Sequence, residues 1–178
     1  MSTCLKSTLS RIFLTVCLLN YGFILSAPKH SWERVFISDN NNEILFSEVI
    51  ENIKKNESFQ DSIYLCPGGY KTIGYGHLIT ELDTFVYLSK KDAENVLKQD
   101  FQKAFNHTPE NISYKKRLAL SHFIFNMGIG RYNRKVKPLV TNDSPIDSVL
   151  LEFCYIKGQK NMNLLRLRNY ELKLWKSK

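Results

Sequence analysis

The sequence has few of the residues that build metal sites, and those it has are badly spaced for one. It contains four cysteines and four histidines among 178 residues. They are scattered along the chain, without the close pairs that bind zinc. The chain also lacks a phosphate-binding glycine loop and the signature of a DNA-recognition helix. We therefore expect no metal and no nucleic-acid partner.

Long apolar runs are also missing, apart from one near the N-terminus. This uncharged run, Ile12 to Pro28, covers 17 residues, whereas a membrane span needs about 20. Lys6 and Arg11 precede it, and Ala27 offers a small residue for cleavage, as in secretory signals. We therefore predict a cleaved signal and an exported chain, secreted or periplasmic. An uncleaved or slowly released membrane anchor is the alternative, because Pro28 disfavours cleavage before it.

The remaining composition is that of one globular domain. Charged residues make up 24% and hydrophobic residues 43% of the chain, which is ordinary for folded proteins. We see no repeats, and predict residues 1–27 as signal, 28–44 as an Asn-rich lead-in and 45–178 as one domain. The net charge of +8 favours an anionic partner such as a bacterial envelope surface. Clusters at 115–117 and 131–137 are solvated basic faces that would strengthen this attraction.

One stretch combines residues suited to hydrolysis. Apolar residues at helical spacing predict a helix over 43–57, which would place Glu57 at its end. A β-hairpin should follow, because the turn at 67–69 separates two alternating runs, 63–66 and 70–75. The hairpin would return the Cys66 thiol and the Thr72 hydroxyl towards the carboxylate. Partial burial would raise the pKa of Glu57 and suit it to act as a general acid.

Four more helices are predicted after the hairpin. Ser89 and Asp92 resemble a capping box for a helix over 89–105, and Ser113 should cap a nearly apolar, central helix that ends at Gly128. Ser144 and the proline after it should start a helix that reaches Gly158. The last helix should cover 164–175.

The order Glu57, eight residues, Cys66, five residues, Thr72 resembles the motif of phage-type lysozymes, the endolysins of glycoside hydrolase family 24. The run Thr72-Ile-Gly-Tyr-Gly-His77 matches the same family. The resemblance covers about residues 45–175 and is strongest at the hairpin. Arg166, Arg168 and Glu171 resemble the family's final segment, although Leu167 replaces one basic residue there. The resemblance implies an α+β, lysozyme-like fold, in which a small antiparallel sheet lobe packs on a mostly helical lobe with the cleft between them.

The resemblance also implies roles for individual residues. Glu57 would be the general acid, and Cys66 stands where most relatives have a carboxylate. A thiol, with a reference pKa of about 8.5, is a poorer anion near neutrality. Thr72 would hold the attacking water, although a β-favoured hairpin residue explains it as well. His77 fits a structural role better than that of a catalytic base.

Three further residues match sugar-contacting positions of the family: Leu78, Phe125 and Asn126. For Leu78 and Phe125, plain core packing is an equal explanation. Asn126 belongs to the run Phe125-Asn-Met-Gly128, which resembles the floor of the family's saccharide cleft.

The function implied is that of a monomeric lysozyme without a cofactor. It would cleave the β-1,4 bond between N-acetylmuramic acid and N-acetylglucosamine in bacterial peptidoglycan, during lysis or remodelling of the wall. Two alternatives stay open: a peptidoglycan-binding protein without turnover, suggested by Cys66, and a cationic membrane-active protein.

Removal of the signal would leave Cys66 and Cys154 as the cysteines of the chain. A disulfide between them is allowed in an exported protein, but it would occupy the motif thiol. Some exported relatives control an active-site cysteine with one from the membrane segment, and Cys17 allows the same hypothesis here.

Overall fold

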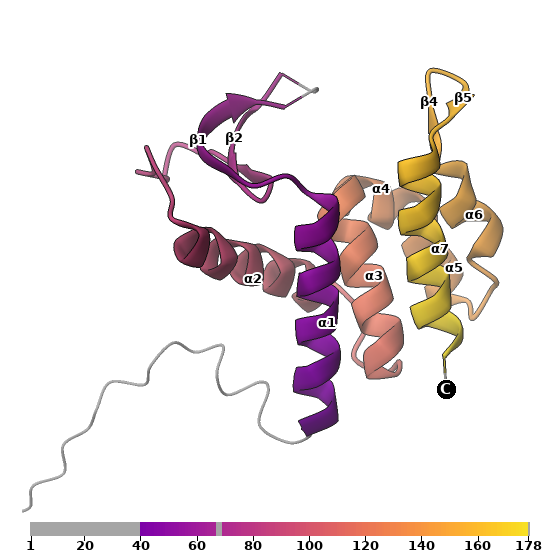
Figure 1. The fold of residues 1–178 in the computed structure, drawn as a ribbon. Coiled ribbons are helices and arrows are strands. Elements are labelled where there is room, and N and C mark those ends of the chain that lie inside the picture. The colour runs from indigo at the N-terminus through magenta and orange to yellow at the C-terminus, as the bar shows by residue number, and fades with distance from the viewer. Residues whose placement is uncertain (1–39, 67–68, 178) are drawn as a thin grey trace, which may run out of the picture. The chain divides into compact units, whose positions relative to one another are not determined.

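Helices dominate the computed structural model, which describes residues 40–66 and 69–177 (Figure 1). The described residues belong to one compact unit, Ser38–Lys178. The proposed signal, Cys4, Cys17, the start of the lead-in and Pro67-Gly68 of the predicted turn lie outside them. In chain order the elements are α1 (Asn40–Asn56), β1 (Gln60–Leu65), β2 (Lys71–Gly74), β3 (His77–Leu78), α2 (Lys90–Asn106), α3 (Tyr114–Met127), α4 (Ile129–Arg131), η2 (Tyr132–Val136), α5 (Lys137–Thr141), α6 (Asp147–Glu152), β4 (Tyr155–Ile156), β5 (Gln159–Lys160) and α7 (Met162–Lys176).

The central helix is α3, as its apolar sequence predicts. All seven residues from Leu118 to Ile124 are buried. Helices α1, α2 and α7 all contact α3, and Figure 1 shows α1, α3 and α7 side by side. Because apolar burial is the main driving force of folding, this packing fixes α1 and α7, from which several candidate site residues come. Within the described residues no helix combines the length and apolar character needed to span a bilayer.

The small sheet is antiparallel, in the order β1-β2-β3. Its register pairs Tyr64 with Thr72 and Thr72 with Leu78. The turn between β1 and β2 is closed by two bonds: Gly69 N donates to Cys66 O at 2.8 Å, and Cys66 N donates to Tyr70 O at 3.0 Å. The predicted hairpin is thus present. The predicted fold class, a small antiparallel sheet with a mostly helical body, is confirmed.

The sheet packs on α2 through a glycine. An added Cβ on Gly74, which has φ +67°, would lie 3.1 Å from the Cβ of Ala93. This distance is too short for an ordinary contact, so only a residue without a side chain lets β2 approach α2 this closely. Ile73, fully buried, belongs to the same core cluster as Ala93. The sheet is therefore held rigidly against the helical body.

Of the five predicted helix starts, those at Ser89 and Ser113 are confirmed, and the other three lie at different residues. Ser89 Oγ accepts from Asp92 N at 3.2 Å, and Ser113 Oγ accepts from Lys116 N at 3.4 Å, so both serines cap their helices. Helix α1, in contrast, begins at Asn40 and includes residues expected in the lead-in. Helix α6 begins at Asp147, without a side-chain cap, and ends at Glu152.

Helix α6 begins later than predicted. Ser144 belongs to the turn after α5, where its backbone N–H donates to Leu139 O at 2.8 Å and its Oγ donates to Asn142 O at 3.4 Å, and α6 has no side-chain cap. Ile146 is fully buried and anchors the start of the helix instead. The chain then turns back as the hairpin β4–β5, which the sequence did not predict. The last helix, α7, starts at Met162, where Asn161 Oδ1 accepts from Leu164 N at 3.0 Å.

Candidate active site

Glu57 follows α1 directly and is held in place by that helix. Its backbone N–H donates to Ile53 O at 2.8 Å, which continues the helical hydrogen-bond pattern. An added Cβ on Gly76 would lie 4.0 Å from Oε2 of Glu57, so the carboxylate faces the segment after β2. Burial raises the pKa of Glu57, and the charge of His122 opposes this by lowering it. The net increase helps the carboxyl keep a proton, as a general acid requires.

One face of the sheet carries the other two motif residues. Residues paired across antiparallel strands point to the same face, as do residues two apart along one strand. Thr72 therefore shares a face with its partners Tyr64 and Leu78. Cys66 extends this face towards the turn, because it lies two residues beyond Tyr64 and is bonded to Tyr70. We call the surface formed by Tyr64, Cys66, Tyr70, Thr72 and Leu78 the motif face.

Tyr64 shows that the motif face is turned towards Glu57. Burial raises the pKa of Tyr64, and the negative charges of Glu57 and Cys66 raise it further. Both acidic groups therefore lie within electrostatic reach of one phenol. The structure thus gathers Glu57, Cys66 and Thr72 around Tyr64, although their catalytic roles stay predictions. Sequence reasoning missed Tyr64, which strand alternation from Cys66 could have identified.

The Thr72 hydroxyl is oriented by the backbone. Thr72 is 2% exposed, and its Oγ1 donates to Tyr70 O at 3.0 Å. Because the hydroxyl proton is used in this bond, the Thr72 oxygen can act only as an acceptor towards other groups. It can therefore accept a hydrogen bond from a water molecule on the motif face.

Cys154 does not bond to Cys66. It is buried, forms no disulfide, and its Sγ donates to Leu151 O at 2.9 Å. The disulfide between the two cysteines that the sequence allows is therefore not formed in this structure, and the motif face keeps its sulfur group.

His77 has a structural role in this structure. Its pairing partner Ile73 is fully buried, so His77 lies on the opposite face of the sheet from Thr72. Nδ1 lies 2.5 Å from Asp100 Oδ2 on α2, and Nε2 lies 3.4 Å from Asp83 Oδ2. The hydrogen bond with Asp100 raises the pKa of His77 against the opposing effect of burial. His77 therefore fastens the sheet to α2.

The three predicted sugar-contacting residues lie in different settings. Leu78 is 53% exposed on the motif face and is open to a ligand. Phe125 is partly buried between the two core clusters, with its ring centroid 6.5 Å from that of Phe101. Asn126 Oδ1 accepts from Arg168 Nη2 at 2.9 Å. Phe125 therefore takes part in core packing, while Asn126 is held by α7.

A buried charged cluster underlies Asn126. Arg168 Nη2 also donates to Glu171 Oε1 at 2.7 Å, and His122 Nδ1 lies 2.8 Å from the same oxygen. All three side chains are almost fully buried. The resemblance pointed to Arg168 and Glu171, but sequence reasoning missed His122, a lone histidine on an apolar helix. Nearby, exposed Arg166 donates to Asn56 Oδ1 at 2.7 Å and ties α7 to the residue before Glu57.

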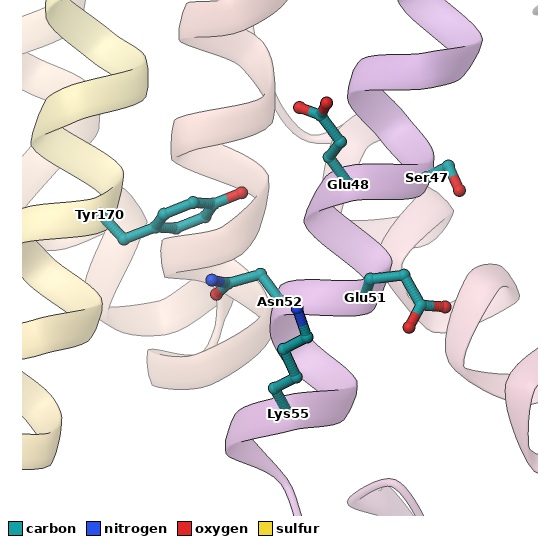
Figure 2. Close-up of a pocket in the computed structure, with 6 residues that line it drawn as sticks. All are labelled: Ser47, Glu48, Glu51, Asn52, Lys55 and Tyr170. Carbon is teal, nitrogen blue, oxygen red and sulfur yellow. The ribbon is translucent and has the colours of Figure 1, made fainter.

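A pocket of about 330 Å³ lies between α1 and α7 (Figure 2). It shares no residue with the motif face, and its lining consists of Ser47, Glu48, Glu51, Asn52, Lys55 and Tyr170. In the part of the chain that the structure describes, no group of three or more His, Cys, Asp or Glu side chains could hold a metal ion.

Solved structures with the same fold are lysozymes and endolysins. The muramidase domain of SpmX from Asticaccaulis excentricus is 23% identical, with a TM-score of 0.61 over 74% of this chain and 96% of that one. A variant of P22 lysozyme is 19% identical, with a TM-score of 0.57 over 74% and 97% of the two chains. The active form of the endolysin Lyz from phage P1 is 16% identical, with a TM-score of 0.54 over 75% and 92%. At these identities the likeness establishes the fold alone.

The sequence itself matches a family model. Residues 54–171 match the model described as phage lysozyme, which is more than half of the chain and includes Glu57, Cys66 and Thr72. A comparison with curated proteins gives no match. The chain belongs to the phage lysozyme family and is a peptidoglycan hydrolase.

Proposed function

We propose that this enzyme cleaves the β-1,4 bond between N-acetylmuramic acid and N-acetylglucosamine in peptidoglycan. The position of partly buried Glu57, opposite a sheet face that carries Cys66 and Thr72, supports the proposal most strongly. Hydrolysis of a glycosidic bond needs a proton for the leaving oxygen and stabilisation of a cationic sugar. Glu57, whose pKa is raised by burial, supplies the proton.

Cys66 and Thr72 serve the sugar and the water. As a thiolate, Cys66 provides the negative charge that stabilises the sugar cation. With an unperturbed pKa of about 8.5, only about 3% of a thiol is ionised at pH 7. Turnover at pH 7 should therefore be slow with Cys66 at this position. Thr72 accepts a hydrogen bond from the attacking water, because its own proton is held by Tyr70 O.

Leu78, Phe125 and Asn126 would shape the sugar-binding surface. Leu78 is exposed beside Thr72 and can pack against the apolar side of a sugar ring. Asn126 keeps its amide nitrogen available for a sugar, since its oxygen is used by Arg168. Phe125 supports Asn126 from the core.

The charge and the N-terminal segment indicate where the enzyme would act. Exposed basic residues on and beside η2 add to the net charge of +8 and favour contact with an anionic cell envelope: Arg131, Arg134, Lys135 and Lys137. We propose that residues 1–27 direct export, and that a monomer lyses or remodels bacterial walls.

The test is the release of reducing ends from purified peptidoglycan at pH 7, with and without reductant. Glu57→Gln should abolish turnover, because an amide cannot donate the proton. The matched control is Glu81→Gln, which makes the same change at an exposed position and should turn over normally. Unchanged activity in Glu57→Gln would reject the proposal.

Cys66→Asp tests the second group. The carboxylate is fully ionised at pH 7, so turnover should increase, by up to about 30-fold if the thiol pKa is unperturbed. Wild-type protein that binds peptidoglycan without turnover, while Cys66→Asp is active, would identify the natural chain as a binding protein on a lysozyme fold. A requirement for reductant would indicate control through a disulfide of Cys66.

A further inference from the structure

Tyr70 is an aromatic residue of the motif face to which the proposed chemistry assigns no role. It lies opposite Cys66 in the hairpin, where its carbonyl oxygen accepts from Cys66 N at 3.0 Å. The same carbonyl oxygen accepts from the Thr72 hydroxyl, also at 3.0 Å. Both bonds use the backbone of Tyr70 and neither involves its ring. They therefore fix the position of the residue beside Cys66 and Thr72, whatever the side chain does.

The Tyr70 side chain is open to a ligand. It is 66% exposed, whereas Thr72, two residues later on the same face, is 2% exposed. Leu78, which pairs with Thr72 from β3, is 53% exposed. The motif face therefore carries two large, exposed apolar side chains, and both of them adjoin the buried Thr72.

The spacing of these side chains fits two neighbouring sugar units. Residues two apart along a strand are separated by about 7 Å, and the Cβ atoms of residues paired across two strands by about 5 Å. Tyr70 thus lies on one side of Thr72, towards the turn, and Leu78 lies on another side, across β2. A glycan strand whose scissile bond lies between Thr72 and Glu57 has one sugar on each side of that bond. The two apolar side chains are placed to contact different sugars.

A sugar ring and a tyrosine ring have complementary surfaces. One face of a pyranose presents C–H groups with a small positive charge, and the face of an aromatic ring is negative. Covering the exposed ring also removes apolar surface from water, which is favourable. Tyrosine makes such a contact at a low cost in conformational entropy, because its side chain has only two χ angles.

We propose that Tyr70 is a substrate-binding residue, on which a sugar next to the scissile bond stacks, on a different side of Thr72 from the sugar that contacts Leu78. It holds the glycan strand and takes no part in proton transfer by Glu57. The proposal rests on the proposed cleavage at Glu57. It adds a residue outside the Glu57, Cys66 and Thr72 motif that determines how tightly the substrate is bound.

The first test measures binding without turnover. Binding of the full chain to purified peptidoglycan is measured by co-sedimentation in the Glu57→Gln background, with enough salt to screen the basic surface. Tyr70→Ala should raise the dissociation constant about tenfold, which corresponds to about 1.4 kcal/mol and is typical of a buried aromatic contact. Tyr70→Phe and Tyr70→Trp should bind as before, because both keep an aromatic face.

The matched control is Leu65→Ala in the same hairpin. Leu65 is 69% exposed and pairs with Lys71, so it is as exposed as Tyr70 but lies on the opposite face of the sheet. This variant should bind like its parent. Equal binding by Tyr70→Ala and Leu65→Ala would overturn the proposal, and so would the absence of binding by the parent.

The second test separates binding from catalysis in the otherwise natural chain. The release of reducing ends is measured over a range of peptidoglycan concentrations. Tyr70→Ala should raise the apparent KM about tenfold and leave kcat nearly unchanged, because a stacked sugar is held equally in the ground state and the transition state. Tyr70→Trp should restore the KM. A fall in kcat with an unchanged KM would show that the substitution acts on Thr72 through the backbone, and would overturn the proposal.

Failure of the proposed function gives a different result. Full turnover by Glu57→Gln would reject Glu57 as the acid. Binding by Tyr70→Ala and Leu65→Ala, read before reducing ends are released, would still show whether Tyr70 holds the glycan strand.

Discussion

The ion pair between His77 and Asp100 should stabilise the protein most strongly in mildly acidic solution. The two atoms, Nδ1 and Oδ2, are 2.5 Å apart, and the side chains are 12% and 20% exposed. The pair joins β3 to α2 and so holds the sheet that carries Cys66 and Thr72. Its removal by His77→Asn tests whether the charge or only the packing of this contact matters.

A hydrogen bond between charged groups contributes about 1.5 to 3 kcal/mol. The pair is more buried than exposed, so little of this is lost to solvent screening. We expect His77→Asn to lower the free energy of unfolding by about 2 kcal/mol at the best pH. For a domain of this size that corresponds to a decrease in Tm of about 6 °C.

The pH dependence follows from the two pKa shifts. The pKa of His77 is raised, so its contribution is complete below the unfolded value of about 6.5 and is lost as the pH rises through the folded value. Burial acts to raise the pKa of Asp100, but hydrogen bonds from His77 and Lys103 outweigh it, and the pKa is lowered. Its contribution is therefore complete above about pH 4 and is lost as the pH falls through the folded value.

The assay is thermal unfolding followed by circular dichroism at pH 3, 5.5 and 9. The difference between wild type and His77→Asn should be largest at pH 5.5 and smaller at both extremes. His107→Asn serves as the exposed control, with little change at any pH. An equal difference at pH 5.5 and 9 would show that packing, and not the ion pair, accounts for the loss.

Four further substitutions have effects whose direction follows from the structure. Gly69→Ala should lower the free energy of unfolding in urea by about 1 kcal/mol because of its φ of +80°. Gly74→Ala should lower it by at least about 1 kcal/mol more, because the added Cβ would press on Ala93. Equal losses in the two variants would contradict the close packing of β2 on α2. Ile73→Ala, at a fully buried position, should lower the free energy of unfolding by about 3 kcal/mol. A loss below about 1 kcal/mol would mean that neighbouring side chains fill the cavity or that water enters it. Ser89→Ala should cost about 1 kcal/mol through loss of the cap on α2, with Ser89→Thr as the variant that keeps a hydroxyl and most of the stability.

The structural elements that could be predicted from the sequence are those determined by interactions between residues close together in the chain. The hairpin was predictable because alternation and a turn suffice to define it, and the structure pairs Tyr64 with Thr72 accordingly. Ser89 and Ser113 were predictable as caps, since each needs only a backbone N–H three residues away.

The elements that were missed depend on partners distant in the chain or on the surrounding packing. Ser144 is a residue type that often caps helices, but it belongs to the turn after α5, with its N–H bonded to Leu139 O, and α6 begins after buried Ile146. The contact of His122 with Glu171 spans 49 residues. No local pattern in the sequence reveals that a histidine on an apolar helix meets a carboxylate from another helix.

The spacing of the motif residues fits one particular register of the hairpin. Tyr64 pairs with Thr72, so Cys66, two residues later, lies over Tyr70, and both motif residues point to the same side of the sheet. Their five-residue separation satisfies this because the hairpin closes with the hydrogen bond from Cys66 N to Tyr70 O. One residue more in the turn would shift the register by one and turn Thr72 away from Glu57. Ile73 and His77 would then leave the face that packs on α2. The same alternation thus gives one face of the sheet to chemistry and the other to stability, and the motif can be recognised from sequence because both faces depend on it.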